Sequence, residues 1–334
     1  MMTTPFTHRM AAHCESGAVT ALLRNAGMSV TESLVFGVSG ALFFGYLSVP
    51  MLPFPTIALR NKPGRIRLKT PGRLGVKMRT QSFRDPAAAT RALDELIERG
   101  IPVGAQVDYF YMDYLPEYTR AHFNAHYVIV TGKKDGRYQI SDTYFPMMSS
   151  LDPTTLQTAR FARGQFAPQG LLFHPESIPE RPDLKAAVRQ GIKDAVFYMV
   201  KLPIPFFGVR GIRFFARKVQ EWPKLTRDID HLSHEVMMIA VILEERGTGG
   251  GGFRYLYATF LQEAAKILGD AGVAEVAKEM MENGDRWRDV SIAAARMGKR
   301  RDLGPQKLHE LGDMILERAD AEQQIFRRLG ALVK

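Results

Sequence analysis

The most reactive side chain in this 334-residue chain is its single cysteine, Cys14, in the stretch AAHCESGAVTALLRNAG. Small and apolar residues recur after it at helical spacing, and Gly27 follows as a stop residue, so we expect a helix over Cys14–Asn25. A thiol in the first turn of a helix meets the positive end of the helix dipole and unpaired backbone N–H groups, which favour the nucleophilic thiolate. Cys14 is therefore a candidate nucleophile. The alternative is a small buried side chain without chemistry.

A histidine and a carboxylate that could activate this thiol occur in HYVIVTGKKDGRYQISD. Two β-rich runs flank a turn that contains glycine and lysine, which predicts a β-hairpin. If Thr131 faces Arg137, His126 lies directly opposite Asp142, and directly opposed side chains contact each other. An aspartate beside one imidazole nitrogen leaves the other nitrogen to act on a thiol. We predict that Cys14, His126 and Asp142 are catalytic, and the alternative is a surface histidine–aspartate pair.

His13 and His122 are rival candidates for the base. His13 adjoins Cys14 but is expected to point elsewhere at the helix entry, and His122 has no evident orienting carboxylate. The chain order of cysteine at a helix start, histidine on a strand and aspartate on the next strand is that of papain-like cysteine enzymes. We therefore rank His126 above both rivals.

The elements that must position these residues divide the chain into two parts. Asp85 and Pro86 open a predicted helix in DPAAATRALDELIERG, and IPVGAQVDYFYMDY indicates a strand that enters an aromatic loop. With the hairpin, this makes the first part α+β. Residues 168–183 contain four prolines and indicate a linker, after which the pattern is helical almost throughout. We expect one domain over residues 1–180 and a mainly α-helical domain over residues 181–334.

Composition limits the classes of function. A hydrophobic fraction of 46% and a charged fraction of 24% are typical of a folded protein. The net charge of +10 is dispersed, and we recognise no nucleic-acid-binding module. One cysteine excludes an internal disulfide framework and a multi-cysteine metal site, and with no secretory signal we expect a cytoplasmic protein. The uncharged stretch 34–52 is rich in glycine and ends near Pro50, so we expect buried structure there and no integral membrane span.

Several of these segments resemble a known family. The stretches HCESGAVTALLRNAGMSVTESLVFGVSGALFFGY, VGAQVDYFYMDY, HFNAHYVIVTG and ISDTYF resemble the N-terminal domain of the butirosin biosynthesis protein H family. The stretch ERGTGGGGFRYLYATFLQEAA resembles the helical domain that commonly follows it. That N-terminal domain is similar to papain-like peptidases, so the resemblance implies a papain-like fold for the first part of the chain.

The resemblance also implies an activity, which is acyl transfer in secondary metabolism. An acyl group would leave the thioester of an acyl carrier protein or of CoA, rest on Cys14 and pass to a small amine. His126 would take the thiol proton and later a proton of the amine, while Asp142 holds the ring. This chemistry needs no cofactor and no metal.

Other residues are candidates for stabilising the oxyanion and binding substrate. The backbone N–H of Cys14 is the first candidate oxyanion donor, and His13 is a candidate for the second, because the preceding THRMAAH lacks the glutamine that papain-like peptidases usually carry. The candidates for substrate binding are two acidic residues in apolar stretches, an aromatic loop residue and two residues after a glycine run: Glu32, Asp108, Tyr109, Arg254 and Tyr257. For the acidic pair, a helix cap or a structural hydrogen bond is the alternative.

Two other functions stay open at this point. A hydrolase of the same fold would pass the acyl group to water, and a carrier-docking module would leave Cys14 inert. The apolar and basic stretch VFYMVKLPIPFFGVRGIRFFARK is expected to be core, with a homodimer interface or a membrane-surface contact as alternatives.

Overall fold

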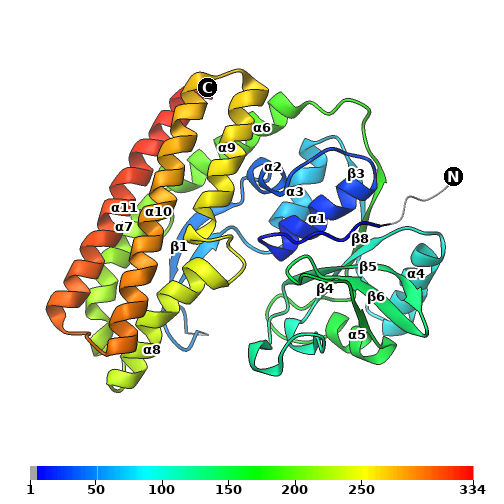
Figure 1. The fold of residues 1–334 in the computed structure, drawn as a ribbon, viewed down its shortest axis with the longest axis horizontal. Coiled ribbons are helices and arrows are strands. Elements are labelled where there is room, and N and C mark those ends of the chain that lie inside the picture. The colour runs from blue at the N-terminus through cyan, green and yellow to red at the C-terminus, as the bar shows by residue number, and fades with distance from the viewer. Residues whose placement is uncertain (1–5, 51, 334) are drawn as a thin grey trace. The chain divides into compact units, whose positions relative to one another are not determined.

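A computed structural model describes residues 6–50 and 52–333, and it divides into two compact units (Figure 1). The first unit comprises residues up to Val35 together with Pro63–Asp183, and the second comprises Phe36–Lys62 together with Leu184–Lys334. The chain is α+β, with sheets followed by a helical C-terminal region. The second unit begins near the predicted boundary, but it also includes the early segment Phe36–Lys62.

The first unit contains a six-stranded antiparallel sheet in the order β3-β8-β4-β5-β6-β7. Its strands are β3 (Lys77–Gln81), β4 (Val103–Val107), β5 (His126–Lys134), β6 (Arg137–Ser141), β7 (Ser149–Leu151) and β8 (Leu172–Ser177). Its helices are α1 (Cys14–Asn25), the start of α2 (Glu32–Val38), α3 (Arg65–Arg73), α4 (Pro86–Glu98), α5 (Pro153–Arg160) and the short 3₁₀ helices η1 (Tyr109–Tyr111) and η2 (Glu117–Thr119). Apolar side chains of β4, β5 and β6 form a core with α4 and α5, while α1 packs on β4, β5 and β8.

The two helices predicted for this unit begin and end where the sequence indicates. α1 starts at Cys14, and Gly27 after its end has a φ of 99°, in the region that favours glycine. In α4 the Asp85 side chain accepts hydrogen bonds from the N–H groups of Ala87 and Ala88, and Pro86 occupies the first turn. Local capping signals therefore decide these boundaries.

The hairpin β5–β6 has a different register from the predicted one. Lys134 pairs with Arg137 across a two-residue turn at Asp135 and Gly136, whose φ angles of 49° and 76° are positive as in a type I′ turn. The strand thus continues through the lysines as far as the Asp-Gly turn. The predicted pairing of Thr131 with Arg137 is therefore wrong.

A β-bulge at Thr131 decides which face of the hairpin carries Asp142. The register shifts there, and beyond the bulge Val130 pairs with Ile140. Because side chains alternate along a strand, His126 lies on the same face as Val130, and Asp142 lies on the same face as Ile140. Without the extra residue the pairing would move by one position and turn Asp142 to the opposite face.

The linker predicted for residues 168–183 is wrong in its middle, where β8 joins the sheet. β8 pairs with β3 along its length but with β4 only at Leu172 and Phe173. Pro175 lies beyond that point, opposite Met78 of β3. Since β4 does not extend to Pro175, the missing N–H removes no hydrogen bond to β4.

The second unit is a helical assembly with a small two-stranded sheet. Its helices are α6 (Leu184–Val196), η3 (Phe197–Lys201), α7 (Gly208–Lys218), η4 (Val219–Lys224), α8 (Ile229–Ala240), η5 (Val241–Glu245), η6 (Gly251–Phe253), α9 (Arg254–Leu268), α10 (Ala271–Arg300) and α11 (Pro305–Leu332). The sheet pairs β1 (Leu42–Leu47) with β2 (Thr56–Arg60), and α7 packs on β1 and α11 (Figure 1). The apolar and basic stretch is core in part: Ile212 and Phe215 of α7 are fully buried, whereas Phe197 and Phe206 are 45% and 42% exposed.

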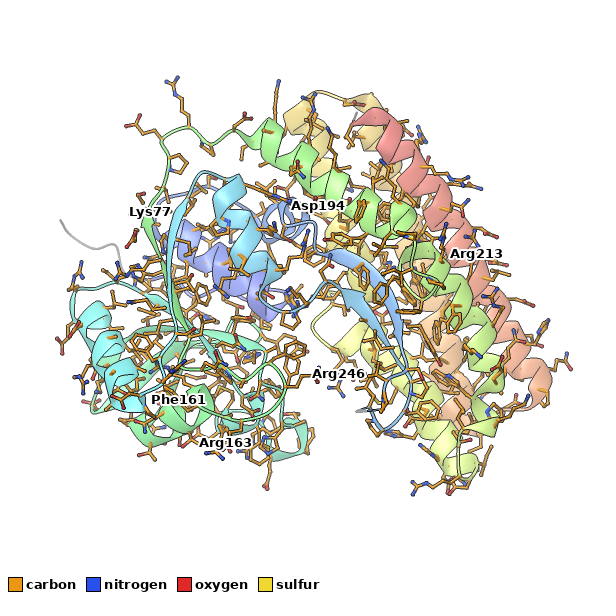
Figure 2. All side chains as sticks on the ribbon, turned by 180° about the vertical axis from the view of Figure 1, so that it is seen from behind. Lys77, Phe161, Arg163, Asp194, Arg213 and Arg246 are labelled. Atoms are coloured by element: carbon orange, nitrogen blue, oxygen red, sulfur yellow. The ribbon has the colours of Figure 1, made fainter. Side chains whose placement is uncertain are left out.

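Basic side chains are exposed in both units. Examples are Lys77 and Arg163 in the first unit and Arg246 in the second (Figure 2). Within the described ranges, no helix combines the length and the apolar character that crossing a membrane requires. The uncharged stretch near the start instead contributes the end of α2 and strand β1, whose Leu42 and Phe44 are fully buried.

Candidate active site

His126 and Asp142 form a buried hydrogen-bonded pair in the first unit. Nε2 of His126 donates to Oδ2 of Asp142 at 2.8 Å, and the two side chains are 4% and 0% exposed. β5 begins at His126, and β6 ends one residue before Asp142, so the strand pairing brings the two side chains together. The contact predicted from the sequence is present, but it arises through the bulged register. Because Nε2 is bonded to Asp142, Nδ1 of His126 is the ring nitrogen that can interact with the thiol of Cys14.

Asp142 is held by further donors. The hydroxyl of Tyr114 donates to Oδ2 at 2.9 Å, and the backbone N–H of Tyr144 donates to Oδ1 at 3.0 Å. Burial alone raises the pKa of a carboxyl group, but His126 and these hydrogen bonds hold the pKa of Asp142 below its usual value. Burial and the neighbouring carboxylate raise the pKa of Tyr114 well above its usual range, so its hydroxyl remains a donor. No sequence pattern pointed to this role of Tyr114.

Cys14 lies beside this pair at the start of α1. Its Sγ is 4.0 Å from the carbonyl oxygen of Ala125, the residue before His126, and Cys14 is among the groups that act on the His126 ring. Burial alone lowers the pKa of His126, but the Asp142 carboxylate and the contact with Cys14 raise it above the ordinary histidine value. The ring therefore holds a proton at neutral pH.

The close approach of α1 to the loop after Asp142 depends on Gly17. The N–H of Ala11 donates to the carbonyl oxygen of Thr143 at 2.7 Å, so the segment before Cys14 is tied to this loop. A Cβ at Gly17 would lie 2.3 Å from Oγ1 of Thr143 and 2.6 Å from Cβ of Ala11. Glycine is required here by space, because any larger residue would push the loop away from the helix.

Glu32 holds the backbone that leads into Cys14. Its carboxylate accepts hydrogen bonds from the N–H groups of Ala12 at 2.8 Å and His13 at 2.9 Å, and from the hydroxyl of Ser16 at 2.8 Å. Burial raises the pKa of Glu32 even against these hydrogen bonds. These contacts are the structural hydrogen bonds named above as the alternative for Glu32, and they do not support its predicted role in substrate binding.

His13 is the N-cap of α1. Its Nδ1 accepts from the backbone N–H of Ser16 at 3.3 Å, and the residue is 4% exposed. The sequence predicts that His13 points away from the thiol of Cys14, and here its Nδ1 faces Ser16. Any donation by His13 to an oxyanion would have to come from Nε2.

Asp108 and His122 form a second histidine–carboxylate pair. Oδ2 of Asp108 accepts from Nδ1 of His122 at 2.8 Å, while Oδ1 accepts from the N–H groups of Phe110 at 3.1 Å and Phe123 at 2.9 Å. Asp108 is 1% exposed, so its carboxylate fastens the loop and caps η1. The expectation that His122 lacks an orienting carboxylate is wrong, because the carboxylate comes from 14 residues earlier in the chain.

Tyr109 is the predicted substrate-binding residue that contacts the candidate site directly. Its ring packs edge-on against His126, with a centroid distance of 5.0 Å and an interplanar angle of 79°. Tyr109 also contributes to the core around α4 and α5. Its contact with a substrate stays a prediction.

Arg254 and Tyr257 lie in the core of the second unit, which differs from the prediction that they line a cleft. Both are 0% exposed, and the guanidinium of Arg254 is paired with Glu322 through hydrogen bonds of 2.9 and 3.0 Å. Glu322 also accepts from Trp287 at 2.7 Å and from Asn283 at 3.0 Å. Substrate binding by Arg254 or Tyr257 is therefore corrected to a structural role, because their position after the glycine run suggested a cleft but both side chains point into the helical core.

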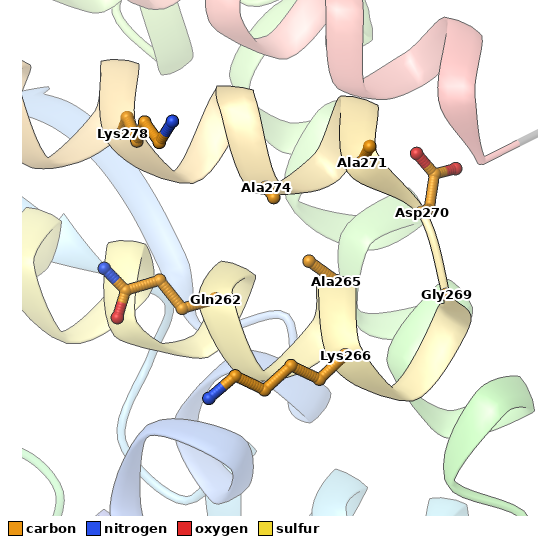
Figure 3. Close-up of a pocket in the computed structure, with 8 residues that line it drawn as sticks. All are labelled: Gln262, Ala265, Lys266, Gly269, Asp270, Ala271, Ala274 and Lys278. Atoms are coloured by element: carbon orange, nitrogen blue, oxygen red, sulfur yellow. The ribbon is translucent and has the colours of Figure 1, made fainter.

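A surface groove of about 450 Å³ lies between α9 and α10, and it contains none of the predicted site residues (Figure 3). Ala265, Ala271 and Ala274 line it together with Lys266 and Lys278. Over residues 6–50 and 52–333, no three His, Cys, Asp or Glu side chains converge as metal ligands. Cys14, His126 and Asp142 all belong to the first unit.

Two family models match the chain. Residues 13–143 match the model described as butirosin biosynthesis protein H, N-terminal, and residues 154–329 match a domain of unknown function, DUF4872. A search of curated proteins gave no match. The first match includes Cys14, His126 and Asp142, and the second covers more than half of the chain. The chain therefore belongs to the family defined by the DUF4872 domain, and the part before that domain matches the N-terminal model of butirosin biosynthesis protein H, an enzyme family of biosynthesis.

Proposed function

We propose that the first unit is a cysteine-dependent acyltransferase of papain-like architecture. The observation that carries the proposal is the His126–Asp142 hydrogen bond beside Cys14 at the start of a helix. A thiolate next to an imidazolium, whose ring a carboxylate orients, is suited to attack on acyl carbonyl groups. The place of the family in biosynthesis supports transfer to an acceptor in preference to hydrolysis.

The first half-reaction acylates Cys14. Its sulfur attacks the carbonyl carbon of a thioester, carried by an acyl carrier protein or by CoA, and a tetrahedral oxyanion forms. The backbone N–H of Cys14, in the first turn of α1, donates to that oxyanion. The carbon–sulfur bond to the carrier then breaks, and the proton on His126 passes to the departing thiolate. The products are an acyl-enzyme, the free carrier thiol and a neutral imidazole.

The second half-reaction transfers the acyl group to a small amine. The amine nitrogen bonds to the acyl carbon, the bond to the sulfur of Cys14 breaks, and His126 takes a proton from the nitrogen. This step restores the thiolate and the imidazolium. Asp142 keeps Nε2 of the ring occupied throughout, and Tyr114 keeps Asp142 in place.

Intact-mass spectrometry tests the first half-reaction. After incubation with acyl-CoA or an acylated carrier protein, we expect a mass increase equal to the acyl group in the wild type and none in Cys14→Ala. The added mass should disappear when a primary amine is supplied, with formation of the amide. If no acyl group gives an adduct, the proposal fails. Equal formation of free acid with and without amine would instead indicate a hydrolase.

A further inference from the structure

The His122–Asp108 pair of the first unit takes part in neither half-reaction of the proposed acyl transfer. His122 differs from His126 in exposure, because its side chain is 65% exposed whereas that of His126 is 4% exposed. Its orienting carboxylate on Asp108 is only 2% exposed. The ring of Phe110 stacks on His122 at a centroid distance of 4.2 Å. A buried carboxylate and a stacked ring thus hold an imidazole that remains open to solvent.

The two histidine pairs are neighbours in the fold. Val107, at the end of β4, pairs with His126, and Asp108 is the next residue of the chain. Of the two residues that follow Asp108, Tyr109 packs on His126 and Phe110 stacks on His122. His122 is also three residues before Ala125, whose carbonyl oxygen contacts the sulfur of Cys14, so their Cα atoms are at most about 11 Å apart.

The loop that carries this pair has the charge and the aromatic surface to attract a cation. Residues 101–123 contain three carboxylates, on Asp108, Asp113 and Glu117, and one arginine, Arg120, so the loop is acidic whereas the whole chain has a net charge of +10. Tyr118 is 91% exposed and Phe123 is 45% exposed. Exposed aromatic faces next to acidic residues favour an ammonium group, because both attract positive charge.

We propose that His122, oriented by the positioning residue Asp108, is a second base of the site, which deprotonates a cationic primary amine before it attacks the acyl group on Cys14. This inference rests on the proposed function. A primary amine is an ammonium ion at neutral pH and has no lone pair for the attack. His122 accepts the first proton through Nε2, the neutral amine forms the carbon–nitrogen bond as the bond to sulfur breaks, and His126 accepts the second proton. His122 then releases its proton to water.

Transfer of the acyl group to the amine can be measured separately if Cys14 is acylated beforehand. Cys14 is acylated with excess acetyl-CoA, the excess is removed, and the acetyl-enzyme is mixed with 1,3-diaminopropane or with hydroxylamine. Hydroxylamine is largely uncharged at neutral pH and needs no base to expose its lone pair. For His122→Gln we expect loading within about twofold of wild type, transfer to the diamine slower by about 100-fold, and transfer to hydroxylamine nearly unchanged. Asp108→Asn should slow transfer to the diamine less, because the amide still accepts from the backbone but no longer orients the ring.

His309→Gln is the matched control, since His309 is also 65% exposed beside a carboxylate, Asp313, but lies on α11 of the second unit. It should behave as wild type with both acceptors. Equal rates for His122→Gln and wild type with the diamine would overturn the inference, and so would an equal slowing with both acceptors, which indicates a structural role. Failure of the wild type to acquire any acyl group would instead refute the proposed function itself.

Discussion

Gly17→Ala tests whether close packing of α1 against the Asp142 loop positions the nucleophile. Alanine adds one methyl group, which would lie 2.3 Å from Oγ1 of Thr143 and 2.6 Å from Cβ of Ala11. These contacts are far inside van der Waals separation. Neither neighbour is a long side chain that could turn away, so the backbone on one side must move.

The expected change in the free energy of unfolding of Gly17→Ala is the sum of two opposing effects. A glycine-to-alanine change inside a helix stabilises by about 1 kcal/mol through helix propensity. Overpacking a closely packed site costs about 1–3 kcal/mol. Since the contacts at Gly17 are severe, we expect a net loss of up to about 2 kcal/mol in the free energy of unfolding. The movement also displaces Ala11 and Thr143, which flank Cys14 and Asp142 in the sequence, so alkylation of Cys14 by iodoacetamide should slow at least tenfold.

Gly72→Ala is the control for this prediction. Gly72 lies within α3, and a Cβ there would meet no atom within 4 Å. We expect this variant to be more stable than wild type by about 0.5–1 kcal/mol, with an unchanged alkylation rate. Urea unfolding and alkylation kinetics measure both quantities. A Gly17→Ala protein that matches Gly72→Ala in stability and in thiol reactivity would refute the reasoning.

Three further predictions concern the candidate site and the second unit. Tyr114→Phe removes a hydrogen bond to a buried carboxylate, so the free energy of unfolding should fall by about 1.5–3 kcal/mol in urea titrations; an unchanged midpoint would contradict the contact. The pKa of Asp142 is lowered and that of His126 is raised in the folded state, so their stabilising contribution should be largest between about pH 4 and pH 6.5. It should decline above that range as His126 loses its proton and below it as Asp142 is protonated, which the difference in stability between wild type and His126→Gln across pH measures. Arg254→Met leaves Glu322 buried without its cation and should cost about 3–5 kcal/mol while the folded protein keeps its thiol reactivity; a loss of reactivity without a loss of stability would restore a substrate role.

Local signals in the sequence account for the elements of the first unit. The bounds of α1 and α4 follow from capping residues and glycine stops, which act over a few residues and are readable without tertiary contacts. The hairpin was predictable too, but its register was not, because Thr131 forms a bulge that only the packed sheet imposes. The Asp-Gly dipeptide at residues 135–136 was the readable signal for the true turn.

Residues that act through distant partners could not be read from the sequence. Tyr114 reaches Asp142 across 28 positions, and Glu32 reaches the backbone before Cys14 across 20 positions. Such contacts depend on how the loops fold back, and no periodicity encodes them. Arg254 was misjudged for a related reason, since its buried partner Glu322 is 68 positions away.

The most direct test of the account is the rate of Cys14 alkylation by iodoacetamide at neutral pH, compared between wild type and His126→Gln. We predict that the wild type reacts at least about tenfold faster, because the ring of His126, oriented by Asp142, activates the sulfur as a nucleophile. Equal alkylation rates in the two proteins would show that His126 does not activate Cys14.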